Sequence, residues 1–377
     1  MRLAKHSICC LLCFFMLFSS CIVMAKPTPP VPEATSYLLM EASTGEILAA
    51  QNETEPRAIA SITKLMTVLL ILEELDKGNI SLSDQVTASL KANEMGGSQI
   101  YLKENEVMDV DTLLKSILVA SANDSCVAMA EYISGSEEAF VERMNQRANE
   151  LGLTATAYKN VHGLDEDGHH SSAKDIAILA REVLKHETVR NYTGIWQEKI
   201  RNDTFELTNT NKLIRFYDGA TGLKTGSTTN AGCCLCATAK RNGMELISVT
   251  LNSPTDAIRF TDAKKLLDFG FSNYALTPLA KTNEVFAQAN IRYAKQDTVN
   301  LYPKENLQLL TLKNETPDVT PRVELFSVKA PLTGGSVCGK LVFEANGETV
   351  KETDLIVTED IAKQSWLDTV KEFFKVI

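Results

Sequence analysis

The sequence predicts an α+β protein in which helices cover one antiparallel sheet, followed by a small all-β domain. Hairpin patterns occur at 37–50 and at 222–251, while the segment between them has mostly helical periodicity. From residue 285 the pattern changes to short alternating strands. We therefore expect a large domain at 34–278 with an inserted helical region, and an all-β domain at 285–358.

The large domain opens with a hairpin and an apolar helix. Two apolar runs at 37–40 and 47–50 flank the turn residues 43–46, which is typical of a β-hairpin. After Pro56 the pattern becomes helical, and the run 65–72 is apolar on nearly every face. A helix of this kind belongs in the centre of a domain.

The middle of the domain predicts further helices, and its end predicts strands. A polar break at 121–124 interrupts one apolar helical pattern, and turn residues separate the later strands. The elements expected here are helices at 110–119, 126–133, 137–151 and 173–184, antiparallel strands at 222–228, 233–239 and 246–251, and a last helix at 261–269 with Gly270 just past its end.

The all-β domain shows no residue pattern that indicates chemistry, so we expect a spacer or docking role. Its strands are expected at 291–293, 299–302, 307–312, 323–325 and 339–343.

The N-terminus predicts export. Basic residues are followed by an apolar run at 8–24, which is typical of a signal peptide at 1–25 that is cleaved after Ala25. A retained signal anchor and lipidation at Cys21 are the alternatives. Without Arg2 and Lys5 the chain keeps 36 basic and 48 acidic residues, a formal net charge of −12 (36 − 48), which argues against a nucleic-acid partner.

The C-terminus predicts contact with a membrane. One helical face of segment 360–377 carries aromatic and aliphatic side chains, while the lysines lie largely elsewhere. The segment is too short and too polar to span a bilayer. We expect it to lie in the membrane interface; the alternative is a helix packed on its own β domain.

The cysteines and histidines do not indicate a disulfide framework or a metal centre. Five cysteines remain after cleavage, unevenly spaced, and those at 233, 234 and 236 fall in an apolar strand pattern, where they are expected to be small buried side chains. Three histidines in the polar loop 160–172 lack a zinc-type spacing. We expect this loop to border the active site and no metal or cofactor to be needed.

The candidate catalytic centre begins at Ser61, in or beside the first turn of the apolar helix. Ser61 and Lys64 are i and i+3, so both side chains lie on one helix face. Burial disfavours the charged lysine, lowers its pKa and leaves a lone pair for the serine proton. A chance Ser-x-x-Lys, with Ser61 as a helix cap, is the alternative interpretation.

Two further motifs support the catalytic interpretation. Ser121 and Asn123 lie 60 residues further on, on the polar break between two helices, and Lys224-Thr225-Gly226 follows in a strand. In order and spacing they resemble the motif set of penicillin-binding proteins and class A β-lactamases.

The chain resembles the low-molecular-mass penicillin-binding proteins, the serine-type D-alanyl-D-alanine carboxypeptidases, over nearly its whole mature length. Beyond the three motifs the likeness includes these positions: Ala60, Gly97-Ser98, Asn160-x-x-Gly163-Leu164, Asp175, Gly222-Leu223 and Ala231-Gly232. The resemblance implies a β-lactamase/penicillin-binding-protein-like fold, a place on the outer face of the cytoplasmic membrane, and a role in peptidoglycan and cell-wall synthesis.

The resemblance also implies a mechanism of acyl transfer. Ser61 attacks the carbonyl between the terminal D-alanines of a peptidoglycan stem pentapeptide, Lys64 takes its proton, and water later hydrolyses the acyl-enzyme. β-Lactams acylate the same serine.

The remaining motif residues take supporting roles by the same resemblance. Ser121 relays a proton to the leaving amine, and Asn123 holds the substrate amide and orients Lys64. The substrate-facing residues of the strand and of the last helix are these: Lys224 as positive charge, Thr225 as a hydroxyl for the substrate carboxylate, Gly226, Ser227 with a backbone N–H in the oxyanion hole beside that of Ser61, and Arg259 as a second carboxylate contact. Ser227 stands where some relatives carry a bulkier residue, which bears on substrate preference.

Three functions other than a carboxypeptidase are the alternatives for the same motif residues. A β-lactamase needs a carboxylate that activates the deacylating water, for which Asp165, Glu166 or Asp167 are candidates. A penicillin-binding sensor would keep the catalytic groups but barely use them. A D,D-endopeptidase would act on cross-links with the same groups.

Overall fold

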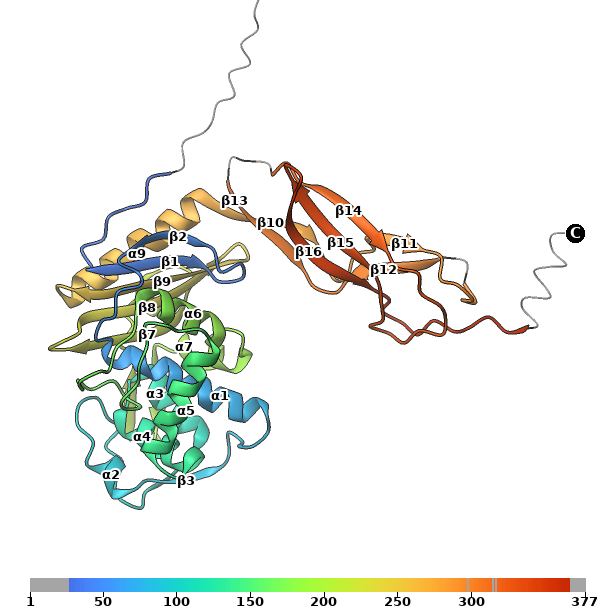
Figure 1. Cartoon of the computed structure of the whole chain (residues 1–377). Helices are drawn as coiled ribbons and strands as arrows, with labels where there is room; N and C mark the ends of the chain where they lie inside the picture. The colour runs from blue at the N-terminus through green and yellow to red at the C-terminus, as the bar shows by residue number, and fades with distance from the viewer. Residues whose placement is uncertain (1–26, 297, 314, 316, 367–377) are drawn as a thin grey trace, which may run out of the picture.

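The computed structural model describes residues 27–296, 298–313, 315 and 317–366. Figure 1 shows two parts, a sheet with its covering helices and an elongated all-β part that follows it in the chain. The expected signal peptide at 1–25 and most of the expected interfacial helix at 360–377 lie outside the described residues. Within the described residues, no helix combines the length and the apolar character needed to cross a bilayer.

The first part is built on a five-stranded sheet in the order β2-β1-β9-β8-β7, all antiparallel. The strands pair as expected, the first hairpin with the last three strands, and Asn242 and Gly243 make the β8–β9 turn with φ of +51° and +83°. Strand bounds are β1 Ser36–Glu41, β2 Ile47–Gln51, β7 Ala220–Thr228, β8 Gly232–Arg241 and β9 Met244–Ser253.

One face of the sheet carries the long helix α9 (Asp256–Asn273), which corrects the expectation that this helix ends before Gly270. Gly270 lies inside the helix because it allows close packing. A Cβ atom built there would lie 2.4 Å from Leu246 Cδ1 and 3.2 Å from Leu39 Cδ2, so a side chain there would displace Leu246 or the helix. Glycine marks a close helix–sheet contact here and not a helix end.

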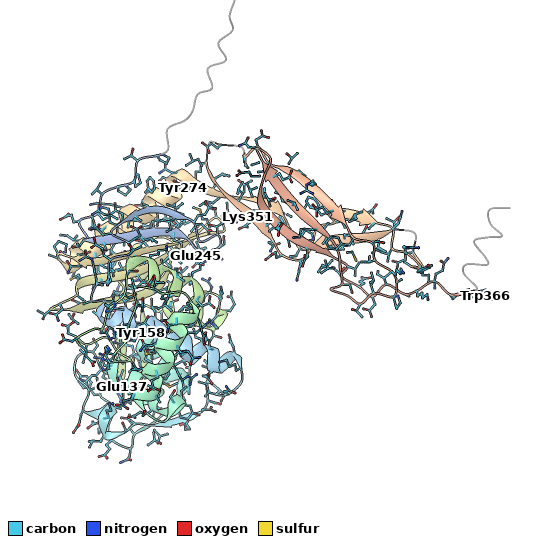
Figure 2. All side chains as sticks on the ribbon, in the orientation of Figure 1. Glu137, Tyr158, Glu245, Tyr274, Lys351 and Trp366 are labelled. Atoms are coloured by element: carbon cyan, nitrogen blue, oxygen red, sulfur yellow. The ribbon has the colours of Figure 1, made fainter. Side chains whose placement is uncertain are left out.

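The opposite face carries most of the other helices, which share one large apolar core with it, whereas the short helix α8 (Leu213–Phe216) contributes Leu213 to the apolar cluster of α9. Helix α1 (Lys64–Asp76) is buried along most of its length, as its all-round apolar sequence predicts, and Tyr158 lies among these helices in Figure 2. The other expected helices are present as α3 Val110–Val119, α4 Asn123–Ser134, α5 Glu137–Glu150 and α6 Ala173–Val183. Side chains at Asp109, Ser136 and Ser172 cap α3, α5 and α6.

Several short elements were not expected from the sequence, because three or four residues carry too little periodicity to identify them. They connect the long elements of this part. Their bounds are η1 Ala60–Thr63, β3 Gln85–Thr87, α2 Leu90–Asn93, β4 Val107–Asp109, η2 Glu187–Val189, α7 Arg190–Thr193, β5 Gln197–Ile200, β6 Phe205–Thr208 and α8 Leu213–Phe216.

The second part consists of two sheets, β10-β13 and β11-β12-β16-β15-β14. The expected strand at 291–293 is wrong: it makes only isolated bridges, such as Arg292 to Lys329. Three strands were missed, β10, β11 and β16. The bounds are β10 Tyr274–Ala280, β11 Ala287–Ala289, β12 Val299–Pro303, β13 Leu307–Leu312, β14 Thr320–Leu325, β15 Val337–Ala345 and β16 Glu348–Ile356.

The two parts meet where α9 runs directly into β10. Tyr274, labelled at this junction in Figure 2, stacks edge-on against Phe269 with ring centroids 6.0 Å apart. Leu310 of β13 belongs to the same apolar cluster as α9. The β part therefore has a packed attachment to the outer helix of the sheet.

Candidate active site

Ser61 lies in a 3₁₀ turn that leads directly into α1, so the expected place in a first helical turn is confirmed. The residue before it, Ala60, has a backbone φ of +49°, which residues other than glycine rarely adopt. Thr63 stabilises this turn, because its Oγ1 donates to the Ala60 carbonyl at 2.8 Å and lies 2.7 Å from His169 Nε2. The surrounding structure thus holds Ser61 in a strained turn.

Lys64 is fully buried, and its Nζ donates three hydrogen bonds. The acceptors are Ser61 Oγ at 2.8 Å, Asn123 Oδ1 at 2.7 Å and the His162 carbonyl at 2.7 Å. These three acceptors use all the donors of an ammonium group. The predicted Ser61–Lys64 pairing is therefore present in the geometry.

Burial makes Lys64 easier to deprotonate than an exposed lysine. Desolvation by burial lowers the pKa of Lys64 from 10.5 to about 8, against the opposing fields of Cys126 and Asp124. Lys224 is also buried, and its pKa lies well below the ordinary value because of desolvation and the charge of Lys64. The charge of Lys64 thus disfavours the proton of Lys224.

Ser121 lies on the short connection between α3 and α4, as expected, whereas Asn123 is already the first residue of α4. The Asn123 backbone N–H donates to the Ser98 carbonyl at 2.7 Å. Its Nδ2 donates to Gly96 O at 2.7 Å, so Oδ1 faces Lys64. Ser121 has φ of +64° and is not among the three partners of Lys64 Nζ.

Strand β7 brings the third motif against the Ser61 turn. A Cβ atom built on Gly226 would lie 2.9 Å from the Ser61 backbone nitrogen and 2.8 Å from the Ile59 carbonyl, so only glycine permits this approach. Lys224 Nζ donates to the Thr225 carbonyl at 3.0 Å, and Thr225 Oγ1 donates to Thr210. Both side chains are buried on the strand.

Ser227 and Arg259 lie at the far end of this motif. Ser227 is exposed, and its hydroxyl lies 3.9 Å from Cys233 Sγ on the neighbouring strand. Arg259 extends from α9 to the backbone of the sheet, where its Nη1 donates to Gly226 O at 2.9 Å. Its guanidinium thereby holds the strand that carries the motif.

The sequence predicts no contact between loop 160–172 and Lys64, yet this loop supplies the His162 carbonyl that accepts a hydrogen bond from Lys64. A backbone acceptor has no residue signature, so no composition or spacing rule could have found it. In the sequence the loop shows only a glycine beside His162, at position 163; in the structure this glycine has φ of +87°, and a Cβ there would lie 2.0 Å from the Ala60 carbonyl. This glycine lets the loop lie directly on the Ser61 turn.

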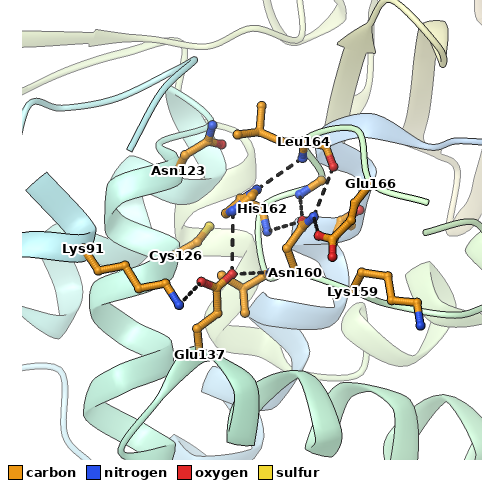
Figure 3. Close-up of polar contacts among 12 residues, drawn as sticks. Lys91, Asn123, Cys126, Glu137, Lys159, Asn160, His162, Leu164 and Glu166 are labelled. Carbon is orange, nitrogen blue, oxygen red and sulfur yellow. Dashed lines mark hydrogen bonds and ion pairs between the residues drawn. The ribbon is translucent and has the colours of Figure 1, made fainter. Parts of the chain in front are cut away.

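The same loop contains the carboxylates that the β-lactamase alternative needs, and two of them already have partners. Asp165 accepts from Thr228 Oγ1 at 2.6 Å, and Glu166 accepts from Asn160 Nδ2 at 2.9 Å. Figure 3 shows Glu166 directed to Asn160 and away from Asn123. Asp165 thus joins the loop to the end of β7.

Two of the loop histidines, His162 and His169, are buried and uncharged. Burial lowers the pKa of His162 to about 3 and that of His169 to about 4, so both rings are neutral at pH 7. No group of three or more His, Cys, Asp or Glu side chains in the described part of the chain is arranged to hold a metal. The five cysteines at 126, 233, 234, 236 and 338 are free thiols.

A serine that is hydrogen-bonded to a buried lysine, at the start of a helix packed against one face of an antiparallel sheet, is typical of active-serine acyl-transfer enzymes. The chain belongs to the D-alanyl-D-alanine carboxypeptidase family, Peptidase S11, whose model matches residues 23–255. Residues 274–363 match the penicillin-binding protein 5 C-terminal domain. The protein is a serine-type D-alanyl-D-alanine carboxypeptidase, and the predicted family and fold class are confirmed.

Known relatives align over nearly the whole chain. The D-alanyl-D-alanine carboxypeptidase DacF of Bacillus subtilis is 44% identical over 344 residues, which cover 90% of this chain and 88% of that protein. The crystal structure of penicillin-binding protein 5 from Haemophilus influenzae superposes on this chain with a TM-score of 0.74. The match covers 89% of this chain and 100% of the other, and the two sequences are 32% identical.

A shorter relative has been solved with an antibiotic bound. Penicillin-binding protein D2 from Listeria monocytogenes, in its ampicillin-bound form, is 30% identical with a TM-score of 0.60 over 65% of this chain and 100% of that chain.

Proposed function

We propose that Ser61 is the nucleophile of this carboxypeptidase and Lys64 its general base. The observation that carries the proposal is the 2.8 Å hydrogen bond between Lys64 Nζ and Ser61 Oγ, with the lysine buried and its pKa lowered to about 8. Near neutral pH a useful fraction of such a lysine is unprotonated and can accept the serine proton.

The reaction proceeds as acyl transfer in two stages. Ser61 Oγ bonds to the carbonyl carbon of the penultimate D-alanine while its proton passes to Lys64 Nζ. The amide C–N bond then breaks, the proton passes to the departing amine with Ser121 as relay, and D-alanine leaves. Water hydrolyses the resulting ester and regenerates the serine.

The remaining motif residues bind the substrate in this proposal. Asn123 orients Lys64 and has a second Nδ2 hydrogen available for the substrate amide. Thr225 and Ser227 face the substrate carboxylate and the oxyanion, while Lys224 and Arg259 add positive potential behind β7. The backbone N–H groups of Ser61 and Ser227 form the oxyanion hole, a role supported by the close approach of Gly226 to Ser61.

Ampicillin tests the assignment of the nucleophile, because a β-lactam forms the same ester and holds it. Intact-mass measurement is expected to show one ampicillin adduct on the parent protein, and peptide mapping to place it on the fragment with Ser61. Ser61→Ala should remain unmodified, while Ser227→Ala should still be acylated. An adduct on the Ser61→Ala protein would refute the proposal.

We also propose that the enzyme is exported and acts at the outer face of the cytoplasmic membrane, held there by the segment 360–377. The amphipathic pattern of this segment supports the proposal, and Trp366, labelled at the end of the described chain in Figure 2, is 76% exposed. Vesicle co-sedimentation of the mature chain tests it. Deletion of residues 366–377 is expected to abolish binding; binding that survives the deletion would contradict the proposal.

A further inference from the structure

The contact between Lys64 and the His162 carbonyl depends on a loop that has no regular structure of its own. Side chains of other elements hold this loop in place. Thr67 of α1 donates to the Val161 carbonyl at 2.7 Å, and within the loop Gly163 N donates to Asn160 Oδ1 at 2.7 Å. The position of the carbonyl relative to Lys64 is therefore set by the contacts of residues 160–164.

Glu137 makes the contacts on the other side of this loop. It is the first residue of α5, and its side chain is only 10% exposed. Its Oε1 accepts from the Val161 backbone N–H at 3.3 Å and lies 3.6 Å from His162 Nε2, as Figure 3 shows. One carboxylate oxygen thus faces both the residue that supplies the carbonyl and the residue before it.

The ring of His162 is oriented for this contact. Leu164 N donates to His162 Nδ1 at 3.2 Å, so Nδ1 carries no proton. The ring is neutral, because burial lowers its pKa to about 3. Its proton is therefore on Nε2, the nitrogen that lies 3.6 Å from the Glu137 carboxylate.

Lys91 balances the charge of Glu137. Its Nζ lies 2.9 Å from Glu137 Oε2 and 2.9 Å from Glu138 Oε1. Glu138 is next in sequence and shares the same lysine, but its side chain is 75% exposed. The chain thus offers a matched control for Glu137 at the neighbouring position.

We propose that Glu137 is a positioning residue for the catalytic lysine, acting through Val161 and His162, with its charge balanced by Lys91. The carboxylate fixes where the His162 carbonyl meets Lys64 Nζ, and so fixes the lysine relative to Ser61. This inference assumes that Lys64 is the general base. Figure 3 shows the chain of contacts from Lys91 through Glu137 to His162.

The other charged and titratable groups facing Lys64 stay unchanged in the variants below. They are Lys224 on β7, and Asp124 and Cys126 on α4. Asp124 is held by the backbone N–H groups of Ile100 and Leu102, and burial raises the pKa of the Cys126 thiol to about 12. Shifts in the pH profile therefore report on Glu137 and Lys91.

The test is the second-order rate constant of acylation by a chromogenic cephalosporin, measured against pH on the mature full chain. Glu137→Gln should lower the plateau rate roughly tenfold, because the loop carbonyl is less well placed. It should also move the acid limb to lower pH, because a negative charge near the lysine is removed. Glu137→Ala should lower the rate further, since the acceptor for Val161 N–H is also lost.

Changing Lys91 gives a shift of opposite sign. Lys91→Met leaves the Glu137 carboxylate unbalanced, which favours the protonated lysine and should move the acid limb to higher pH. The double variant Lys91→Met with Glu137→Gln should return the limb toward the parent position while the rate stays low. A role confined to folding would lower thermal stability and leave the limb in place.

Glu138→Gln is the control and should match the parent in both rate and limb. An acid limb that stays at the parent pH in Glu137→Gln and in Lys91→Met would overturn the inference. So would equal effects of the changes at 137 and 138. If the parent profile shows no acid limb, or if Lys64→Met reacts at the parent rate, the general base itself is wrong; this outcome is distinct from failure of the Glu137 inference.

Discussion

The two parts of the molecule differ in what they bury. The sheet-and-helix part encloses ionisable side chains, among them Lys64, Asp124, Lys224 and Asp262, each at most 1% exposed. In the β part, the buried polar residue among the described positions is Thr353, and ion pairs such as Lys340 with Glu352 lie at the surface.

This difference separates catalysis from support. Burying a lysine costs free energy because its charged form loses hydration, and the same loss lowers its pKa to a value useful to a base. Within the described part of the chain, Lys64 and Lys224 are the lysines buried in this way, and both lie in the candidate active site. The β part shows no such groups among its described residues, which fits the spacer or docking role expected from its sequence.

The largest expected effect in this comparison comes from removing a buried charge. Lys64→Met should lower the rate of acylation by penicillin about 10³-fold, because the serine loses its base. Lys340→Met, on the β part, should leave the rate unchanged. Stopped-flow measurement of acylation checks both, and a Lys64→Met rate within tenfold of the parent would contradict the contrast.

Glycine substitutions compare the packing of the two parts. Gly163→Ala introduces a Cβ that would lie 2.0 Å from the Ala60 carbonyl at φ of +87°, and should cost about 3 kcal/mol or more, together with activity. Gly335→Ala has almost the same φ, +88°, but no atom within 4 Å, and should cost about 1 kcal/mol. Denaturant unfolding gives both values; equal costs would mean that the loop does not pack closely on the Ser61 turn.

The pH dependence of the parent enzyme sharpens the role of burial. The pKa of Lys64 is lowered to about 8, and the base works only when neutral, so acylation should rise about tenfold per pH unit below pH 8 and level off above it. Rates measured from pH 6 to 10 test this expectation. A limb with a midpoint near 10.5, the ordinary lysine value, would show that Lys64 is hydrated in solution.

The smallest effect is expected at the surface of the β part. Glu352→Gln breaks the 3.0 Å pair with Lys340, and both groups are exposed to solvent that screens their charges. The midpoint of thermal unfolding should not change measurably, and neither should D-alanine release. A clear drop in either would mean that this surface supports the enzyme more than the comparison implies.

Much of the sheet-and-helix part could be predicted from sequence, because its elements are long and their patterns strong. The apolar run after Ser61 and the Asn242-Gly243 turn identified their elements directly. Gly270 misled the prediction, because a glycine inside a packed helix and one beyond a helix end look alike in sequence. Contact with Leu246 decides between them, and that contact is tertiary.

The β part was harder to predict because most of its strands are short. Strand β16 was missed, although the Asn346-Gly347 dipeptide before it is the same hairpin signal as Asn242-Gly243 between β8 and β9, and both of its residues have positive φ in the structure. At the candidate site, side-chain motifs located Ser61, Lys64 and Asn123. The His162 carbonyl and the role of Glu137 could not be found, since both depend on where a loop folds back.

The most direct test of the account is D-alanine release from a diacetyl-Lys-D-Ala-D-Ala type substrate by the mature chain, beside Ser61→Ala and Lys64→Ala. The account predicts release by the parent and loss of release in both variants. Release that persists in Ser61→Ala would show that this serine is not the nucleophile. Covalent penicillin binding by a parent that releases no D-alanine would leave the site intact but contradict its assignment to carboxypeptidase turnover.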